Sequence, residues 1–236
     1  MLGTCLAAFV QGLSGFAFGL VAMSVWAWSI EPQMAAPMVV FGSVLGQSLA
    51  FGALRRNLHL DRALPFIVGG LFGVPLGVFL LRYVDPRLFR GGVGIFLIGY
   101  CSVMLLARRL PVVSRGGRGL DATIGWIGGV MGGLGGLTGP APTLWCTLRG
   151  WDRDTQLAVF QSFNLSMQLV TLAGYAISGA LTRGMGLVFA VMVPVTIVPT
   201  LAGIGLYRRI SAARFQRLVL ALLLVSGVLL VLSLRR

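Results

Sequence analysis

The chain has 236 residues, of which 57% are hydrophobic and 11% are charged, and its formal net charge is +13. A soluble globular domain carries about a quarter charged residues, so the composition excludes one and predicts a membrane protein along nearly the whole length. All 19 basic residues are arginines that gather at the ends of apolar runs. That placement is typical of membrane flanks beside anionic headgroups, so it predicts the lipid bilayer rather than nucleic acid as the partner.

Eight apolar regions follow one another, and many have the roughly 17–25 residues that cross a bilayer core. They span about residues 1–30, 34–54, 63–82, 88–107, 120–148, 155–181, 184–207 and 214–234. The first region has no basic residue at its start and is longer than the core of a signal peptide, so we expect it in the mature protein. A basic linker at 108–119 separates a first half, 1–107, from a second half, 120–236.

The two halves resemble each other weakly when the first is shifted by 121 positions. The pairs brought together in this way are Gly12 with Gly133, Ser43 with Asn164, and Gln47 with Gln168. Internal duplication is common in secondary transporters. The sequence therefore predicts an all-α, polytopic membrane protein of two related halves, each with about four hydrophobic segments.

The first region of each half is rich in residues that weaken a helix. Seven glycines stand within residues 128–139, followed by Pro140 and Pro142, and the first half has Gly12, Gly15 and Gly19. Glycine costs about 1 kcal/mol and proline about 3 kcal/mol per helix position relative to alanine, so we expect both regions to be broken or re-entrant. Close helix packing through small residues is the alternative. We prefer packing for the glycines of the third region, namely Gly69, Gly73 and Gly77.

The arginine count favours re-entrant first regions. If all eight regions cross the membrane, the two sides hold 10 and 9 arginines. If the first region of each half returns to its own side, the two sides hold 13 and 6. The positive-inside rule favours the second arrangement, with the N-terminus outside and the two halves inverted relative to each other.

The residues that carry chemistry are neutral inside the predicted membrane segments. Every Asp and Glu lies at a predicted helix end or loop, and the only histidine, His59, lies beside an arginine pair. Charged side chains inside a bilayer mark ion and proton paths, so the sequence argues against a carboxylate proton relay. Neutral polar groups in hydrocarbon either join helices or line a polar cavity.

We predict a substrate site where the two broken regions meet. Thr138 is expected to cap a half-helix that starts near Pro140, and a second half-helix is expected after Ser14. Two such starts point free N–H groups at the bilayer centre, where amides of Gln47, Asn164 and Gln168 add donors, so a small oxyanion or carboxylate is the expected guest. The predicted substrate-binding residues are Gly12, Ser14, Gly15, Ser43, Gln47, Gly133, Gly136, Thr138, Pro140, Asn164 and Gln168.

The chain shows no catalytic arrangement. Cys5, Cys101 and Cys146 lie far apart and have no metal-ligand spacing, and the sequence contains neither a zinc-protease motif nor a phosphate-binding loop. No nucleophile and base are placed together. We therefore expect no enzyme, no cofactor and no metal.

Three motifs resemble the TauE/SafE family of membrane permeases, also described as sulfite exporters. They are GLSGFAFG at Gly12–Gly19, GGLFGVPLG at Gly69–Gly77 and GGVMGGLGGLTGPAPT at Gly128–Thr143. Their order and spacing carry the resemblance more than any single motif. It implies a multi-pass carrier of the bacterial inner membrane that moves sulfite, sulfonates or small organic anions, commonly as an exporter.

Three functions remain open at this point: a secondary transporter of small anions, a passive anion channel, and a membrane scaffold for a partner protein. A scaffold needs neither paired helix breaks nor matching amides inside the membrane, so both features favour transport. Self-association into a homo-oligomer is also open.

Overall fold

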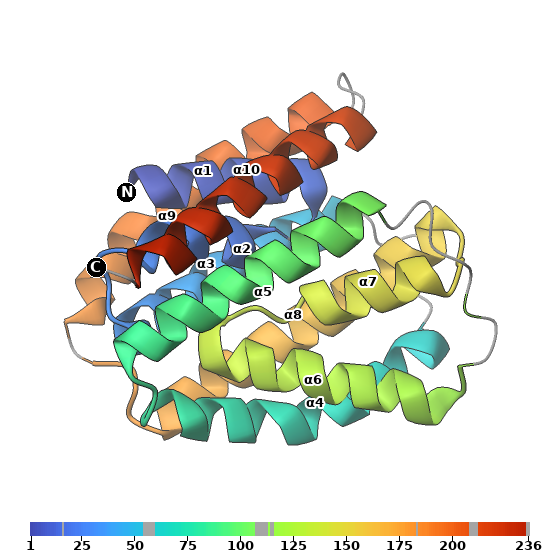
Figure 1. Cartoon of the computed structure of the whole chain (residues 1–236), viewed down its shortest axis with the longest axis horizontal. Helices are drawn as coiled ribbons and strands as arrows, with labels where there is room; N and C mark the ends of the chain where they lie inside the picture. Colours follow the sequence, from blue (N-terminus) through green and yellow to red (C-terminus); the bar gives the residue numbers. More distant parts are fainter. Residues whose placement is uncertain are drawn as a thin grey trace.

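The computed structural model describes residues 1–15, 17–53, 60–106, 113, 116–182, 184–207 and 212–234. These residues form ten helices and no strands, so the predicted all-α fold is confirmed for them (Figure 1). The helices are α1 (Leu2–Ser14), α2 (Phe18–Trp26), α3 (Pro32–Ala53), α4 (Leu60–Leu81), α5 (Pro86–Leu106), α6 (Arg118–Gly135), α7 (Pro140–Leu148), α8 (Arg153–Ile177), α9 (Met185–Tyr207) and α10 (Ala212–Ser233).

A glycine in the left-handed conformation divides the first and the fifth predicted regions. Gly15 follows α1 with φ of 83°, and Gly136 follows α6 with φ of 68°. Glycine adopts this conformation without the steric cost that a Cβ brings, and it commonly ends a helix. The next helices, α2 and α7, begin within four residues, so the predicted break in each region is confirmed.

Both broken regions fold back as hairpins. The indole nitrogen of Trp145, near the end of α7, donates to the Asp121 carboxylate at the start of α6 over 2.7 Å. In the other hairpin, a Cβ built on Gly3 in α1 would lie 2.7 Å from the indole nitrogen of Trp26, the last residue of α2. The second helix of each pair therefore ends beside the start of the first, which is the geometry of a re-entrant segment.

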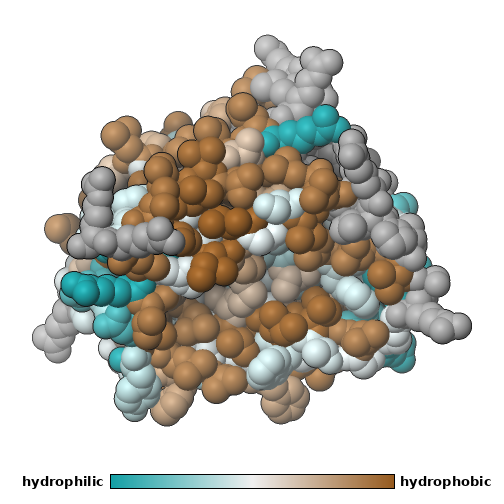
Figure 2. All heavy atoms as spheres, in the orientation of Figure 1, coloured by the Kyte–Doolittle hydropathy of each residue, from teal (hydrophilic) through white to brown (hydrophobic). Residues whose placement is uncertain are grey.

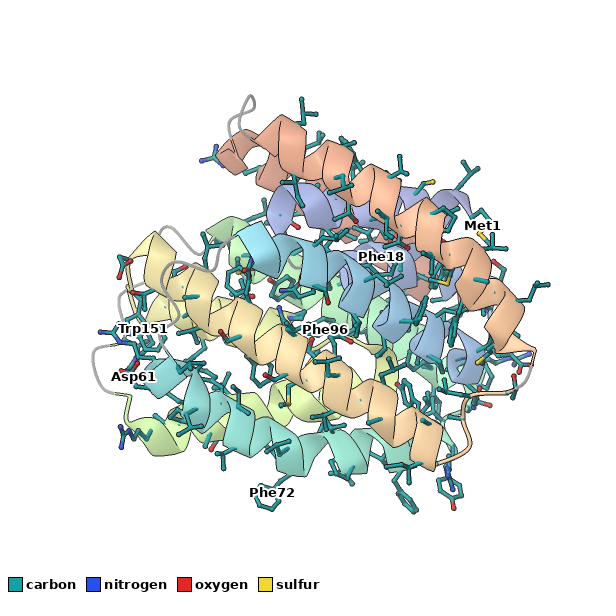
Figure 3. The ribbon with its side chains drawn as sticks, turned by 180° about the vertical axis from the view of Figure 1, so that it is seen from behind. Met1, Phe18, Asp61, Phe72, Phe96 and Trp151 are labelled. Atoms are coloured by element: carbon teal, nitrogen blue, oxygen red, sulfur yellow. The ribbon has the colours of Figure 1, made fainter. Side chains whose placement is uncertain are left out.

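The connections between helices gather at two ends of the molecule. At one end, the guanidinium groups of Arg62 and Arg149 each lie 5.4 Å from the centre of the Trp151 ring. At the other end, Arg90 donates to the carbonyl of Ala27 over 2.8 Å. Figure 3 shows Trp151 at one extremity and Met1 at the other. This grouping matches the arrangement that the arginine count favours.

Glycines allow α4 and α6 to pack backbone against backbone. Cβ atoms built on Gly69, Gly73 and Gly77 would collide with carbonyl oxygens of α6, so these positions admit no side chain. The packing role predicted for them is therefore confirmed. In return, Gly133 of α6 lies against α4, where a Cβ would collide with the carbonyl of Val74. Gly133 was expected at the substrate site, and the structure places it in this interface instead.

A similar interface joins α1 and α9. A Cβ on Gly12 would collide with the carbonyl of Thr200, and one on Gly203 would collide with the carbonyl of Phe9. Gly12 thus serves helix packing too, and it does not line the site for which it was predicted.

The outer surface is apolar. Helices α4, α5 and α9 are long and apolar enough to cross a membrane, judged over the part of the chain that the structure describes. Large side chains on them face outward, such as Phe72 in α4, which is 73% exposed (Figures 2 and 3). Such a surface is costly in water and suited to lipid, so the chain is a membrane protein. Helices α3 and α8 contact each other and carry three buried amides, Gln47, Asn164 and Gln168.

Candidate functional site

A small cavity lies where the two helix breaks meet. It receives residues from α1, α2, α3, α7, α8 and the turn between α6 and α7. Its volume, measured for the centre of a water-sized sphere, is about 10 Å³. That is room for about one water molecule. The lining residues are Gln11, Gly19, Leu20, Ser43, Gln47, Gly136, Leu137, Thr138, Gly139, Pro140, Asn164 and Gln168.

The two breaks approach each other closely at this cavity. Gly19, in the first turn of α2, lies against Gly136, the residue that ends α6. A Cβ built on Gly19 would come 2.8 Å from the Gly136 carbonyl oxygen. A glycine is therefore required at the point where the first hairpin meets the second.

Two helix starts point at the cavity without a side-chain cap. Gly139 precedes α7 and Ala17 precedes α2, and neither residue has a side-chain oxygen that could accept a hydrogen bond from its helix. The first turns of both helices contribute lining residues. The first N–H groups of a helix have no partner inside it, and they carry the positive end of its dipole. Pro140 and Pro142 have no N–H group, so the N–H donors come mainly from the start of α2, while both helices bring the positive end of their dipole to the cavity.

The predicted cap at Thr138 is wrong. The residue before α7 is Gly139, and the hydroxyl of Thr138 instead accepts a hydrogen bond from Gln168 Nε2 at 3.1 Å. Two prolines occupy the first turn of α7, where no intrahelical partner exists for an N–H group in any case.

The Gln168 amide is held at its nitrogen. Besides the bond to Thr138, its Nε2 donates to the Gly136 carbonyl at 3.0 Å. A side-chain amide nitrogen has two N–H groups, and in Gln168 both donate to atoms of the protein. Since a carbonyl oxygen only accepts, the orientation of this amide is fixed, and its Oε1 is the free end. Gln168 was expected to donate to an anion, and the structure corrects that expectation.

Gln11 is held in the same way by partners in α3. Its Nε2 donates to the Ser43 carbonyl at 3.1 Å and to Gln47 Oε1 at 3.2 Å. The contact with a backbone carbonyl again fixes the amide orientation. Gln47 accepts through its oxygen and keeps its Nε2 without a partner among the described residues, and its role as a donor to an anion stays a prediction.

Four polar atoms at the cavity have no hydrogen-bond partner among the described residues. They are Gln11 Oε1, Gln47 Nε2, Asn164 Oδ1 and Gln168 Oε1. The four side chains are between 1% and 4% exposed. Leaving one buried polar group unpaired costs about 1–3 kcal/mol, so four in one place indicate a site that a polar guest completes.

Seven of the predicted residues come together at the cavity, and they are Ser43, Gln47, Gly136, Thr138, Pro140, Asn164 and Gln168. Gly12, Gly133, Ser14 and Gly15 do not line it. Ser14 donates to the Val10 carbonyl at 2.8 Å and accepts from the Ala17 amide at 3.3 Å, which shapes the break in the first hairpin. Gly15 ends α1 through its left-handed backbone and so helps to form the same break.

Sequence reasoning missed five lining residues, which are Gln11, Gly19, Leu20, Leu137 and Gly139. Gln11 had a usable signal, because it is a polar residue inside an apolar region and lies one turn before the break. The others have apolar side chains or none, so only their backbone brings them to the cavity.

Among the described residues, no group of three or more His, Cys, Asp or Glu side chains is placed to hold a metal. The family described as sulfite exporter TauE/SafE matches the chain over residues 1–230. No curated protein and no solved structure gives a significant match.

Proposed function

The chain belongs to the sulfite exporter TauE/SafE family, and we propose that it is a secondary transporter that exports small anions across the bacterial inner membrane. Sulfite, sulfonates and small organic acids are the substrate class. The observation that carries this proposal is the cavity at which two uncapped helix starts and a free amide donor, Gln47 Nε2, converge. Helix starts bind anions through free N–H groups and dipole, without any fixed positive side chain.

Transport through this site requires the cavity to expand. A cavity for about one water molecule is smaller than a sulfite ion, which has four heavy atoms. The conformation described here is therefore a closed one, and the substrate enters when a hairpin moves. The glycine-lined contacts of α6 on α4 and of α1 on α9 suit such movement, because smooth backbone surfaces slide with little change in packing.

The helix contacts support two halves of inverted topology. Helix α4 of the first half packs on α6 of the second, and α9 of the second packs on α1 of the first. Likewise α4 contacts α8, and α9 contacts α3. Each half thus supports the hairpin of the other, as expected if 1–107 and 120–236 are related units that rock about a shared site. By the positive-inside rule, the end with Arg62 and Arg149 faces the cytoplasm.

The test is flux of sulfite through the purified protein in liposomes. Saturable flux that follows an imposed gradient supports a carrier. Flux that does not saturate indicates a channel, and absence of flux for sulfite, sulfonates and small carboxylates alike contradicts the proposal.

A glycine pair provides the matched variants for this assay. Gly19→Ala places a methyl group against the Gly136 carbonyl where the two breaks meet, and we expect it to abolish flux. Gly99→Ala, on α5, meets no atom within 4 Å and should transport as the wild type does. Equal flux through both variants would show that the meeting point of the breaks is not the transport site.

A further inference from the structure

The free atoms at the cavity are of two kinds, and an anion pairs with only one kind. Gln47 Nε2 is a donor and suits an oxyanion. Gln11 Oε1 and Gln168 Oε1 are acceptors, and their orientation is fixed because both nitrogens already donate to backbone carbonyls. Asn164 Oδ1 also has no hydrogen-bond partner among the described residues and adds a third oxygen, on an amide that no hydrogen bond holds in one orientation. An anion is repelled by these oxygens.

The helix ends show the same two polarities. The starts of α2 and α7 contribute positive dipole ends, whereas Gly136 contributes the carbonyl end of α6 to the same lining. The last carbonyls of a helix carry partial negative charge and attract cations. The C-terminal end of α6, which is the negative end of that helix dipole, lies next to Gln168, whose nitrogen donates to the Gly136 carbonyl.

Charge balance points in the same direction. None of the twelve lining residues is charged. An anion that enters a buried, uncharged cavity alone loses its hydration without gaining a counter-charge, which is costly in a low-dielectric medium. A monovalent cation bound beside a monovalent anion, such as hydrogensulfite or a sulfonate, makes the cargo neutral.

We propose that the cavity also binds a sodium ion, held by the side-chain oxygens of Gln11, Asn164 and Gln168, next to the transported anion. The inference rests on the proposed function, since it assigns a cation that accompanies the anion in the same site, where the outward gradient of the anion supplies the driving force. Alkali cations take neutral oxygen ligands, and in other transporters carbonyls at broken helices supply them. A sodium ion can accept ligation from three oxygens, whereas one water molecule has only two protons to donate.

Binding of sodium is measured first without any anion. The midpoint of thermal unfolding of the full-length protein in detergent is compared in sodium chloride and in choline chloride at equal ionic strength. We expect a higher midpoint in sodium, because a ligand of the native state stabilises it by mass action. Equal midpoints in the two salts overturn the sodium site and favour a bound water.

Coupling is then measured as sulfite flux in liposomes, with sulfite supplied as its N-methylglucamine salt. Cooperative binding makes each ligand raise the affinity for the other, so we expect sodium to lower the apparent KM for sulfite by about tenfold. Flux that is equal in sodium and in choline overturns the sodium site and leaves the anion carrier standing. A sodium-dependent midpoint without any flux supports the cation site and contradicts the carrier.

Two substitutions at Asn164 separate the cation from the anion. Asn164→Leu removes one oxygen, breaks no hydrogen bond between described residues, and should abolish the sodium effect on the midpoint. Asn164→Asp keeps the shape and adds a negative charge, so it should enlarge the sodium effect while raising the KM for sulfite. A sodium effect that falls in both variants overturns the assignment.

Gln33→Met is the matched control, because this amide donates to the carbonyls of Leu81 and Val84, away from the cavity. It should leave the sodium effect unchanged. A loss of the effect in this variant as well would show that sodium acts elsewhere on the protein.

Discussion

Gln47 and Gln168 match when the two halves are aligned, yet they present opposite ends of the amide to the cavity. In the first half, Gln47 accepts from Gln11 and leaves its nitrogen free. In the second half, Gln168 donates to Gly136 and leaves its oxygen free. Helices α3 and α8 thus give the cavity one free donor and one free acceptor.

The neighbouring hairpins cause this difference. Gln11 in α1 aligns with Gly132 in α6. The amide of Gln11 reaches Gln47, whereas the space beside Gly132 is filled by the Thr138 methyl group, and the Thr138 hydroxyl meets Gln168. The different residues at these positions of the two hairpins therefore hold the two glutamines in opposite orientations. The comparison teaches that two matching glutamines present opposite ends of the amide to one cavity when the residues that hold them differ.

The largest effect is expected for Gln168→Leu. It removes two donors, leaves the buried Gly136 carbonyl unpaired, and deletes the free oxygen. The combined loss of about 2–4 kcal/mol is enough to reduce sulfite flux to background in liposomes. The protein should still elute as a folded, monodisperse species, because the outer apolar contacts are unchanged. Undiminished flux would remove Gln168 from the site.

Gln47→Leu sharpens the contrast between the two glutamines. It deletes the free donor, so the KM for sulfite should rise about tenfold, the value of one hydrogen bond to a charged group. The dependence of flux on sodium should persist, since the acceptors of the second half are intact. The sulfite KM in sodium and in choline is the measurement. A variant that loses sodium dependence while keeping its sulfite affinity would reverse the roles assigned here.

Much of this fold follows from sequence patterns, and the limits have physical causes. The apolar regions and the breaks at Gly15 and Gly136 were predictable because hydrophobic length and helix-weakening residues act locally. The role of each glycine was not. Gly133 faces α4 whereas Gly136 faces the cavity, and both belong to one glycine-rich run. Which stripe of a helix meets which neighbour depends on tertiary packing.

The sequence predicted which residues line the site better than it predicted which of them donate and which accept hydrogen bonds. Of the seven lining residues that were recognised, five have neutral polar side chains, which are rare in apolar helices, and Gly136 and Pro140 mark the helix break. The donor or acceptor roles of these five were not recognised, because the direction of an amide depends on partners that lie far away in the chain. Gln168 and Gly136 are 32 positions apart, and Gln11 and Gln47 are 36 apart.

Thr138→Val tests whether the hydroxyl orients Gln168. The substitution keeps the methyl group that fills the space beside Gly132 and removes one acceptor of the Gln168 nitrogen. One neutral hydrogen bond contributes about 1 kcal/mol, so we expect flux at low sulfite to fall about fivefold. Thr138→Ser keeps the hydroxyl and should retain more flux than the valine variant. A valine variant with wild-type flux would show that Gly136 alone holds the amide.

The smallest effect is expected for Gly46→Ala on α3. A Cβ there would lie 2.8 Å from Cδ of Gln11, so the amide must shift by a few tenths of an ångström. Gln11 is a flexible side chain, and we therefore expect only a two- to threefold rise in the sulfite KM, about 0.5 kcal/mol. Gly92→Ala, on α5, meets no atom within 4 Å and controls for the change in helix propensity. Since the same methyl group is added in both variants, a difference between them reports the position of Gln11 itself. An equal KM in the two would mean that Gln11 tolerates displacement, and that the fixed acceptor of the first half is less important than the one at Gln168.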